Sequence, residues 1–278
     1  DRIHASDSKL PAGTVHDVTL TTTDGVQLHG WHIIPPGLNC ATRADCDREL
    51  ARADHVVLFF HGNGGDRRGR EFDSLSFALL NSHVFLFDYR GYGENAGAPT
   101  EEGLATDARA IWEYVTQDRQ IRADRVIIYG ESLGGGVATR LTAGLCRADT
   151  PPAGLVLAGT FSSMTATASS HYPWLPVGLI LRDRYESDRH VAAIDCPILQ
   201  IHGTHDDIVP LEVASKLYEA IPPQSASGVP KQFVEFSAAS HNDFDEQLFQ
   251  SSIGTFLKNI AASQETSARS LPTSSTDE

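Results

Sequence analysis

The sequence lacks the features that mark membrane-spanning, metal-binding and nucleic-acid-binding proteins. No apolar run reaches the roughly 18 residues of a transmembrane helix. The four cysteines form neither a C-x-x-C pair nor a His/Cys cluster with metal-ligand spacing, so we expect no metal and no cofactor. Lysine and arginine together number 22 against 36 acidic residues, and the formal net charge of −14 argues against a nucleic-acid partner and against an anionic-membrane surface.

Methionine is also scarce. The chain begins at Asp1 and its one methionine is Met164, so we expect a signal peptide or a membrane anchor ahead of this sequence, and membrane contact only through that anchor. Cys40 and Cys46 bracket a short polar loop. A disulfide between them would favour an extracytoplasmic or membrane-anchored location. The alternative is a flexible insertion with two incidental thiols, in a cytoplasmic protein.

What the sequence does contain is a regular alternation of short apolar runs with helical patterns. Its 278 residues and 41% hydrophobic content suit one soluble domain. Asp24-Gly25 predicts an antiparallel hairpin turn. The predicted strands are Val15–Thr22, Val26–Ile34, His55–Phe60, His83–Phe87, Arg125–Tyr129, Gly154–Ala158, Ile198–Ile201 and Gln232–Phe236. The predicted helices lie near Arg68–Leu80, Thr100–Gln117, Ser132–Leu145, Leu211–Ala220 and Asp243–Ala262. This order predicts an α/β fold with a doubly wound, mainly parallel, eight-stranded sheet and helices on both faces.

Two segments depart from this alternation. Phe161–His190 is too long for a simple connection and is rich in aromatic residues, proline and arginine, so we expect a small helical cover over the sheet edge. Ser263–Glu278 is rich in serine and threonine without a periodic apolar face, which predicts a disordered tail. The folded domain is therefore expected to span residues 1–262.

The stretch Gly130-Glu131-Ser132-Leu133-Gly134 follows an apolar strand and precedes a predicted helix. A serine with glycine two residues before and two residues after it, on such a turn, is typical of a nucleophile elbow. The turn is so tight that side chains at both flanking positions would clash between the neighbouring strand and helix. The alternative is an ordinary glycine-rich turn.

A serine nucleophile needs a histidine base, and that histidine needs a carboxylate to orient it. In proteins with this elbow the acid follows the serine in the chain and the histidine follows the acid. His241 is the one histidine of twelve beyond the last carboxylate loop, although an exposed helix-cap histidine is the alternative. Asp206 and Asp207 both follow a predicted strand, and we favour Asp206 as the acid.

A second glycine-rich loop, His61-Gly62-Asn63-Gly64-Gly65, follows a predicted strand. An oxyanion hole needs preorganised N–H donors, and the backbone N–H groups of Asn63 and Leu133 are the candidates. The alternative is that these glycines only turn the chain. The loop does not fit the G-x-x-x-x-G-K-[ST] pattern of nucleotide-binding proteins.

Five motifs in this order resemble the α/β-hydrolase superfamily of serine hydrolases. They are His61-Gly62-Asn63, Asp88-Tyr89-Arg90-Gly91-Tyr92-Gly93, Gly130-Glu131-Ser132-Leu133-Gly134-Gly135, His202-Gly203-Thr204-His205-Asp206 and Ser240-His241-Asn242-Asp243. The most similar branch includes the acyl-protein thioesterase-like and lysophospholipase-like α/β-hydrolase-domain proteins. The resemblance implies the α/β-hydrolase fold with Ser132 as nucleophile, Asp206 as acid and His241 as base. Relative to the family pattern, the stretch Pro36–Asp54 looks like an insertion.

The predicted function is hydrolysis of a carboxylic ester or thioester through an acyl-enzyme. We expect a small-molecule or lipid-like acyl ester as substrate, and the sequence carries no signal for an oligomeric state. The Asp88–Gly93 motif is interpreted as structural, with Tyr92 lining the pocket. Phe161, Tyr172 and Trp174 are candidates for an acyl pocket, or else are core residues of the cover. A peptidase or amidase with the same triad, and a non-hydrolytic binding module or receptor, are the alternative functions.

Overall fold

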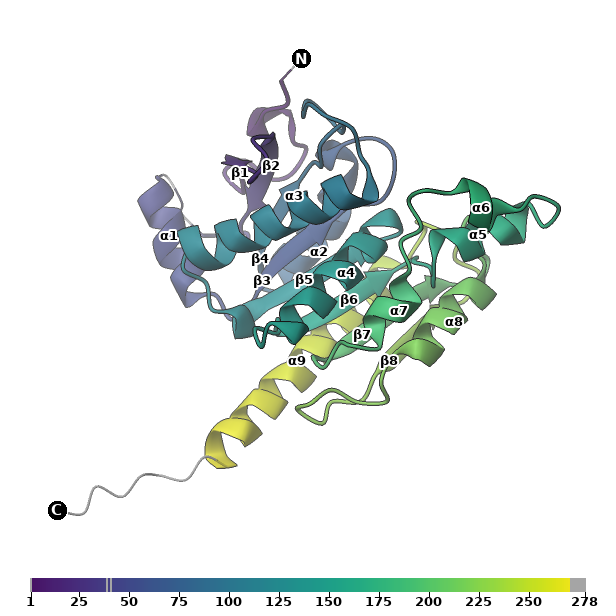
Figure 1. Ribbon diagram of the computed structural model, residues 1–278. Coiled ribbons are helices and arrows are strands. Elements are labelled where there is room, and N and C mark those ends of the chain that lie inside the picture. The colour runs from purple at the N-terminus through teal and green to yellow at the C-terminus, as the bar shows by residue number, and fades with distance from the viewer. Residues whose placement is uncertain (1, 39, 41, 271–278) are drawn as a thin grey trace.

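The computed structural model describes residues 2–38, 40 and 42–270. Within these residues one sheet has the order β1-β2-β4-β3-β5-β6-β7-β8 (Figure 1). Strands β1 and β2 form the predicted antiparallel hairpin, β2 pairs antiparallel with β4, and all other pairs are parallel. The strands are β1 (Val15–Thr21), β2 (Gln27–Ile33), β3 (Val56–Phe60), β4 (His83–Phe87), β5 (Val126–Glu131), β6 (Gly154–Ala158), β7 (Ile198–Gly203) and β8 (Gln232–Phe236). The predicted eight-stranded, mainly parallel sheet is confirmed.

Helices cover both faces of this sheet. They are α1 (Arg43–Arg52), α2 (Glu71–Leu79), α3 (Glu101–Glu113), α4 (Leu133–Arg147), α5 (Met164–His171), α6 (Val177–Ile180), α7 (Ser187–Val191), α8 (Leu211–Ala220) and α9 (Glu246–Ser270). A π-helical turn, Tyr114–Asp118, continues α3, so the two together match the predicted helix Thr100–Gln117.

Each face of the sheet carries its own hydrophobic core, because successive side chains of a strand point to opposite faces. In β3, Val56, Leu58 and Phe60 belong to the core beneath α3, α4, α7 and α8, and Val57 and Phe59 belong to the core beneath α2 and α9. The central strands are therefore apolar on both faces, which is why they appear in the sequence as unbroken apolar runs.

The stretch Pro36–Asp54 contains a helix that the sequence interpretation missed. The Thr42 side chain accepts a hydrogen bond from the Asp45 N–H (3.2 Å) and caps α1. Cys40 and Cys46 are buried as free thiols in a small cluster with Ile34, and the proposed disulfide is not formed. Burial raises the pKa of Cys40 to about 12, so this thiol is not reactive at neutral pH.

The predicted end of the last helix was wrong. Helix α9 continues to Ser270, eight residues beyond the expected end at Ala262. Its inner face packs on the sheet through Phe249, Ile253 and Phe256. The remainder of the predicted tail, residues 271–278, lies outside the described residues. No helix in the described ranges is both long and apolar enough to cross a membrane.

Helices α5, α6 and α7 lie in the segment predicted as a cover. In Figure 1, α5 and α6 form a small protrusion at the upper right, beyond α8. The backbone N–H of Met164 donates to Arg184 O (2.8 Å), and that of Asp188 donates to Ser162 O (2.9 Å), so the cover leaves and rejoins the domain at nearly the same place.

Candidate active site

Ser132 lies on a sharp turn between β5 and α4. Its backbone has φ 51° and ψ −115°, a left-handed conformation that is strained for a residue with a side chain. Hydrogen bonds hold it there, because the Ser132 N–H donates to Ala158 O (2.9 Å) and its carbonyl accepts from Thr160 Oγ1 (2.8 Å). The turn therefore presents the Ser132 hydroxyl above the carboxyl end of the sheet.

The two flanking glycines leave no space for a side chain. A Cβ atom on Gly130 would lie 2.5 Å from Gly134 O, and one on Gly134 would lie 2.0 Å from Phe60 O. Both obstacles are backbone atoms, which cannot rotate away. The steric reason predicted for the two glycines is present in the structure.

Ser132, His241 and Asp206 form a continuous chain of hydrogen bonds. The Ser132 Oγ lies 2.9 Å from His241 Nε2, and the His241 Nδ1 lies 2.7 Å from Asp206 Oδ2. Ser132 follows β5, Asp206 follows β7 and His241 follows β8. Because β5, β7 and β8 run parallel in one sheet, with β6 between β5 and β7, their carboxyl ends lie at the same edge.

The acid is held firmly. Asp206 is buried, and its Oδ1 accepts hydrogen bonds from the N–H groups of Ile208 (2.9 Å) and Val209 (2.8 Å). Burial by itself would raise the pKa of Asp206, but the hydrogen bonds from His241 and Val209 keep that pKa below its ordinary value. Asp206 is thus ionised at neutral pH, whereas the side chain of Asp207 is exposed.

The loop His61–Gly65 lies beside the elbow. A Cβ atom built on Gly62 would lie 3.4 Å from Ser132 Cβ, so the loop backbone passes directly over the serine. Leu133 begins α4, and an N–H in the first turn of a helix has no acceptor within that helix. The Tyr92 hydroxyl donates to Asn63 Oδ1 (2.5 Å) and fixes that side chain. Asn63 lies on the loop after β3 and Leu133 is the first residue of α4, and their part in an oxyanion hole stays a prediction.

The motif Asp88–Gly93 makes contacts beneath these loops. Asp88 Oδ1 accepts from the Arg67 N–H (2.7 Å), and Arg90 makes ion pairs with Asp107 (2.8 Å) and Asp24 (2.7 Å). Burial raises the pKa of Asp88 to about 6, although the ion pair with Arg67 opposes that rise. These contacts join loops and helices rather than reaching Ser132.

The sequence interpretation assigned no role to three residues near the site, which are Arg70, Glu131 and His202. Arg70 Nε lies 3.0 Å from Glu131 Oε2, and the other carboxylate oxygen of Glu131 lies 2.9 Å from where a Gly62 Cβ would be. Burial raises the pKa of Glu131 against the charge of Arg70. His202 Nε2 donates to Val209 O (2.9 Å) behind Asp206. Glu131 and His202 belong to recognised motifs, but nothing in the sequence pairs Arg70 with the elbow.

The four pocket candidates do not lie together. Phe161 is fully buried in the core, and Tyr92 is half-buried next to Asn63. Tyr172 and Trp174 are exposed on the cover, so the alternative that they are core residues of the cover is wrong. Their role in lining an acyl pocket stays a prediction.

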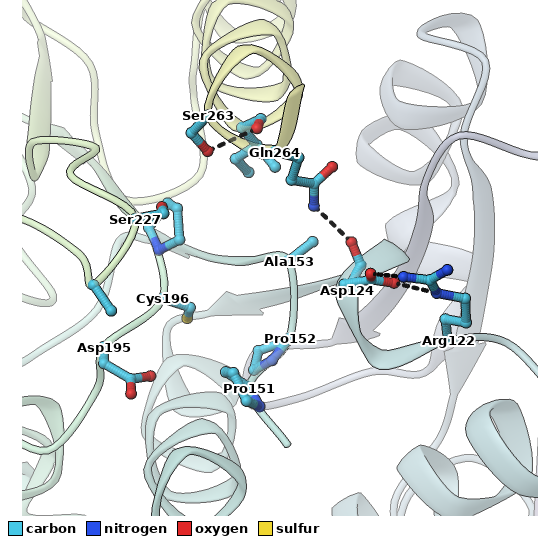
Figure 2. A pocket seen from close by; sticks show the side chains of 13 residues that line it. Arg122, Asp124, Pro151, Pro152, Ala153, Asp195, Cys196, Ser227, Ser263 and Gln264 are labelled. Carbon is cyan, nitrogen blue, oxygen red and sulfur yellow. Dashed lines mark hydrogen bonds and ion pairs between the residues drawn. The ribbon is translucent and has the colours of Figure 1, made fainter. Parts of the chain in front are cut away.

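A cavity of about 520 Å³ lies at the other end of the sheet (Figure 2). Most of its lining residues directly precede β5, β6 or β7, and the others lie in the loop before β8 or on α9. The triad residues instead follow the ends of strands. The side-chain amide of Gln264, on α9, donates to Asp124 O (2.8 Å) across its rim. The cavity is therefore separate from Ser132. It is lined by Arg122, Asp124, Pro151, Pro152, Ala153, Asp195, Cys196, Pro197, Ala226, Ser227, Ile260, Ser263 and Gln264.

The sequence and the fold were compared with protein families, with known proteins and with solved structures. The model of one family, described as "Alpha/beta hydrolase family", matches residues 57–246. An uncharacterized protein of Mycobacterium tuberculosis is 36% identical over 93% of this chain and 84% of its own length. The lysophosphatidylserine lipase ABHD12 of Danio rerio is 33% identical over 81% of this chain and 63% of its own length. The solved structure of the Pyrococcus furiosus esterase Pf2001 superposes with a TM-score of 0.66 at 20% identity, over 93% of this chain and 96% of that one.

Proposed function

The chain belongs to the alpha/beta hydrolase family, and from this premise we propose that it is a serine hydrolase that cleaves carboxylic esters of lipid-like acyl compounds. The observation that carries the proposal is the hydrogen-bonded chain from Ser132 through His241 to Asp206. The similarity to a lipase also supports a hydrolase activity.

In the proposed mechanism, Ser132 Oγ attacks the acyl carbonyl and His241 Nε2 takes the hydroxyl proton. Asp206 accepts the hydrogen bond from His241 Nδ1, which keeps Nε2 free to act as a base and stabilises the imidazolium that forms. The N–H groups of Asn63 and Leu133 donate to the oxyanion. Loss of one such donor typically costs about 3 kcal/mol of transition-state stabilisation.

Collapse of the tetrahedral intermediate expels the alcohol, which takes its proton from His241. The acyl group is then bound to Ser132 as an ester. Water attacks this ester while His241 accepts a proton, and the carboxylic acid leaves as Ser132 regains its hydrogen. The same steps would cleave a thioester or an amide, with a thiol or an amine as the leaving group in place of the alcohol.

The substrate class follows from similarity and composition. The relative from Danio rerio is named a lysophosphatidylserine lipase, so a monoacyl phospholipid is the first substrate to test. We propose Tyr92 as a lining residue, because it lies half-buried beside the proposed oxyanion loop. A pure binding module on the same scaffold would need no aligned triad.

A fluorophosphonate probe tests the proposal directly. The wild-type protein should be labelled, and Ser132→Ala should lose both labelling and hydrolysis of p-nitrophenyl esters by several orders of magnitude. Ser240→Ala is a matched control, because this exposed serine precedes His241 and should leave labelling unchanged. Full hydrolysis by Ser132→Ala would overturn the mechanism, and an unlabelled wild type would favour a binding module.

A further inference from the structure

A largely buried ion pair joins the turn before α2 to the nucleophile elbow. Glu131 is the last residue of β5 and is buried directly before Ser132. Arg70 ends a short 3-10 helix, Arg67–Arg70, and its Nε lies 3.0 Å from Glu131 Oε2. A buried ion pair is weak evidence for stability, because the cost of removing both charges from water offsets their attraction. This pair is therefore better explained by what it holds in place.

Both members of the pair also bind the backbone of the loop that carries Asn63. Arg70 Nη2 donates to Gly64 O (3.4 Å). Burial raises the pKa of Glu131, and a hydrogen bond from the Gly62 N–H to the carboxylate opposes that rise. In agreement with this bond, Glu131 Oε1 lies 2.9 Å from where a Gly62 Cβ would be. The ion pair thus contacts the loop on both sides of Asn63.

The loop beyond Asn63 has little restraint of its own. Gly64 and Gly65 have φ values of 79° and 69°, and nothing lies within 4 Å of a Cβ atom built on either residue. Glycine can leave such a conformation for many others at small cost. Contacts from outside the loop must therefore keep it in place. Tyr92 holds the Asn63 side chain (2.5 Å), and Arg70 holds the Gly64 carbonyl.

The orientation of one peptide group decides whether the Asn63 N–H can reach an oxyanion. That N–H belongs to the peptide between Gly62 and Asn63, whose carbonyl accepts from His61 Nδ1 (2.7 Å). In a trans peptide the carbonyl and the N–H point in opposite directions, so this N–H points away from His61 Nδ1. A shift of about 1 Å in a group that contacts the reacting atoms can cost roughly a hundredfold in rate. Loss of support beside Asn63 should therefore appear in kcat.

We propose that Arg70 and Glu131 are positioning residues that hold the Asn63 N–H in the oxyanion hole. The inference rests on the proposed function and deepens it, because it assigns a role in the reaction to two residues that act through the loop. Glu131 fixes the loop to the strand that presents Ser132, and Arg70 fixes it to the turn before α2. The nucleophile and the oxyanion donor are thereby kept in one geometry.

Hydrolysis of p-nitrophenyl butyrate by the full chain tests this role. Arg70→Gln should lower kcat by about ten- to a hundredfold and change KM by less than about twofold, because only the transition state carries the oxyanion. Titration with a fluorophosphonate counts the reactive serines, so that kcat is stated per labelled Ser132. Arg68→Gln is the matched control. Arg68 lies on the same turn but is exposed and pairs with Asp66 (2.7 Å), so its replacement should leave kcat unchanged.

A second arginine variant separates positioning from folding. The ammonium of Arg70→Lys can keep the ion pair with Glu131 but cannot also reach Gly64 O as the guanidinium fork does, so kcat should fall by only about three- to tenfold. A trifluoromethyl ketone adds to Ser132 as a hemiketal whose oxyanion occupies the hole. Its Ki should rise in Arg70→Gln by the same factor by which kcat/KM falls, whereas a loss of stability alone would leave Ki unchanged.

Glu131→Met removes the acceptor for the Gly62 N–H, and its kcat per labelled serine should fall about as far as that of Arg70→Gln. A kcat within about twofold of the wild type in Arg70→Gln, or an unchanged Ki, would overturn the positioning role while the proposed function stands. If Arg70→Gln does not fold, a wild-type kcat in Arg70→Lys has the same meaning. A wild type that neither reacts with the fluorophosphonate nor hydrolyses the ester would overturn the proposed function, and this inference with it.

Discussion

Replacement of Asp206 by asparagine tests the hydrogen-bond geometry of the site most sharply. The side chain keeps its size, but one carboxylate oxygen becomes an NH2 group and the negative charge is lost. Oδ1 already accepts two backbone N–H groups, from Ile208 and Val209. An amide NH2 cannot replace an acceptor there, so the asparagine must turn its NH2 toward His241.

The consequence is a wrong histidine tautomer. Asp206 Oδ2 accepts from His241 Nδ1 (2.7 Å), whereas an NH2 at that position would donate to Nδ1 and leave the proton on Nε2. Nε2 would then donate to Ser132 Oγ instead of accepting its proton. We expect kcat to fall by roughly four orders of magnitude, as in other Ser-His-Asp enzymes. This is about 5.4 kcal/mol at 1.36 kcal/mol per factor of ten.

The assay is steady-state hydrolysis of p-nitrophenyl butyrate, with thermal melting to confirm that the variants fold. Asp207→Asn is the matched control, because its exposed side chain should change kcat by less than about twofold. An Asp206→Asn enzyme within tenfold of the wild type would refute the reasoning. A larger loss for Asp207→Asn would show that the acid is the neighbouring residue.

Two further predictions concern stability. Gly134→Ala should lower the free energy of unfolding by about 3 kcal/mol or more, or prevent folding, because its Cβ would lie 2.0 Å from Phe60 O. Gly144→Ala is the control, since no atom lies within 4 Å of the Cβ position, and it should raise the free energy of unfolding by about 0.5–1 kcal/mol. Urea denaturation measures both. Burial, and then the charge of Glu131, raise the pKa of Asp73 from 3.8 to about 7. The folded state therefore binds this proton more tightly, and stability falls as pH rises from about 4 to about 7. Asp73→Asn should be more stable than the wild type by roughly 2–4 kcal/mol at pH 8 but not at pH 4, and an equal difference at both pH values would contradict this assignment.

Much of the fold could be predicted from local patterns. Buried parallel strands need apolar side chains on both faces, so Val56–Phe60 and Val126–Tyr129 stand out as short unbroken runs. At the elbow the reason for Gly130 is equally local, because a Cβ atom there would meet Gly134 O, whereas one on Gly134 would meet Phe60 O of the neighbouring strand β3. The boundaries were less certain. Thr42 caps α1 within a polar stretch whose two cysteines suggested a loop.

Only the tertiary structure decided which side chains meet. Asp206 and Asp207 are adjacent and chemically equal, yet the turn after β7 buries one and exposes the other. Arg70 reaches Glu131 across the sheet edge, a pairing between residues 61 positions apart. Trp174 belongs to an aromatic segment that would suit the core of the cover equally well, but in the structure it is exposed. Strand periodicity and turn glycines act over a few neighbouring residues and are written in the sequence, whereas the direction of a loop side chain depends on contacts with distant parts of the chain.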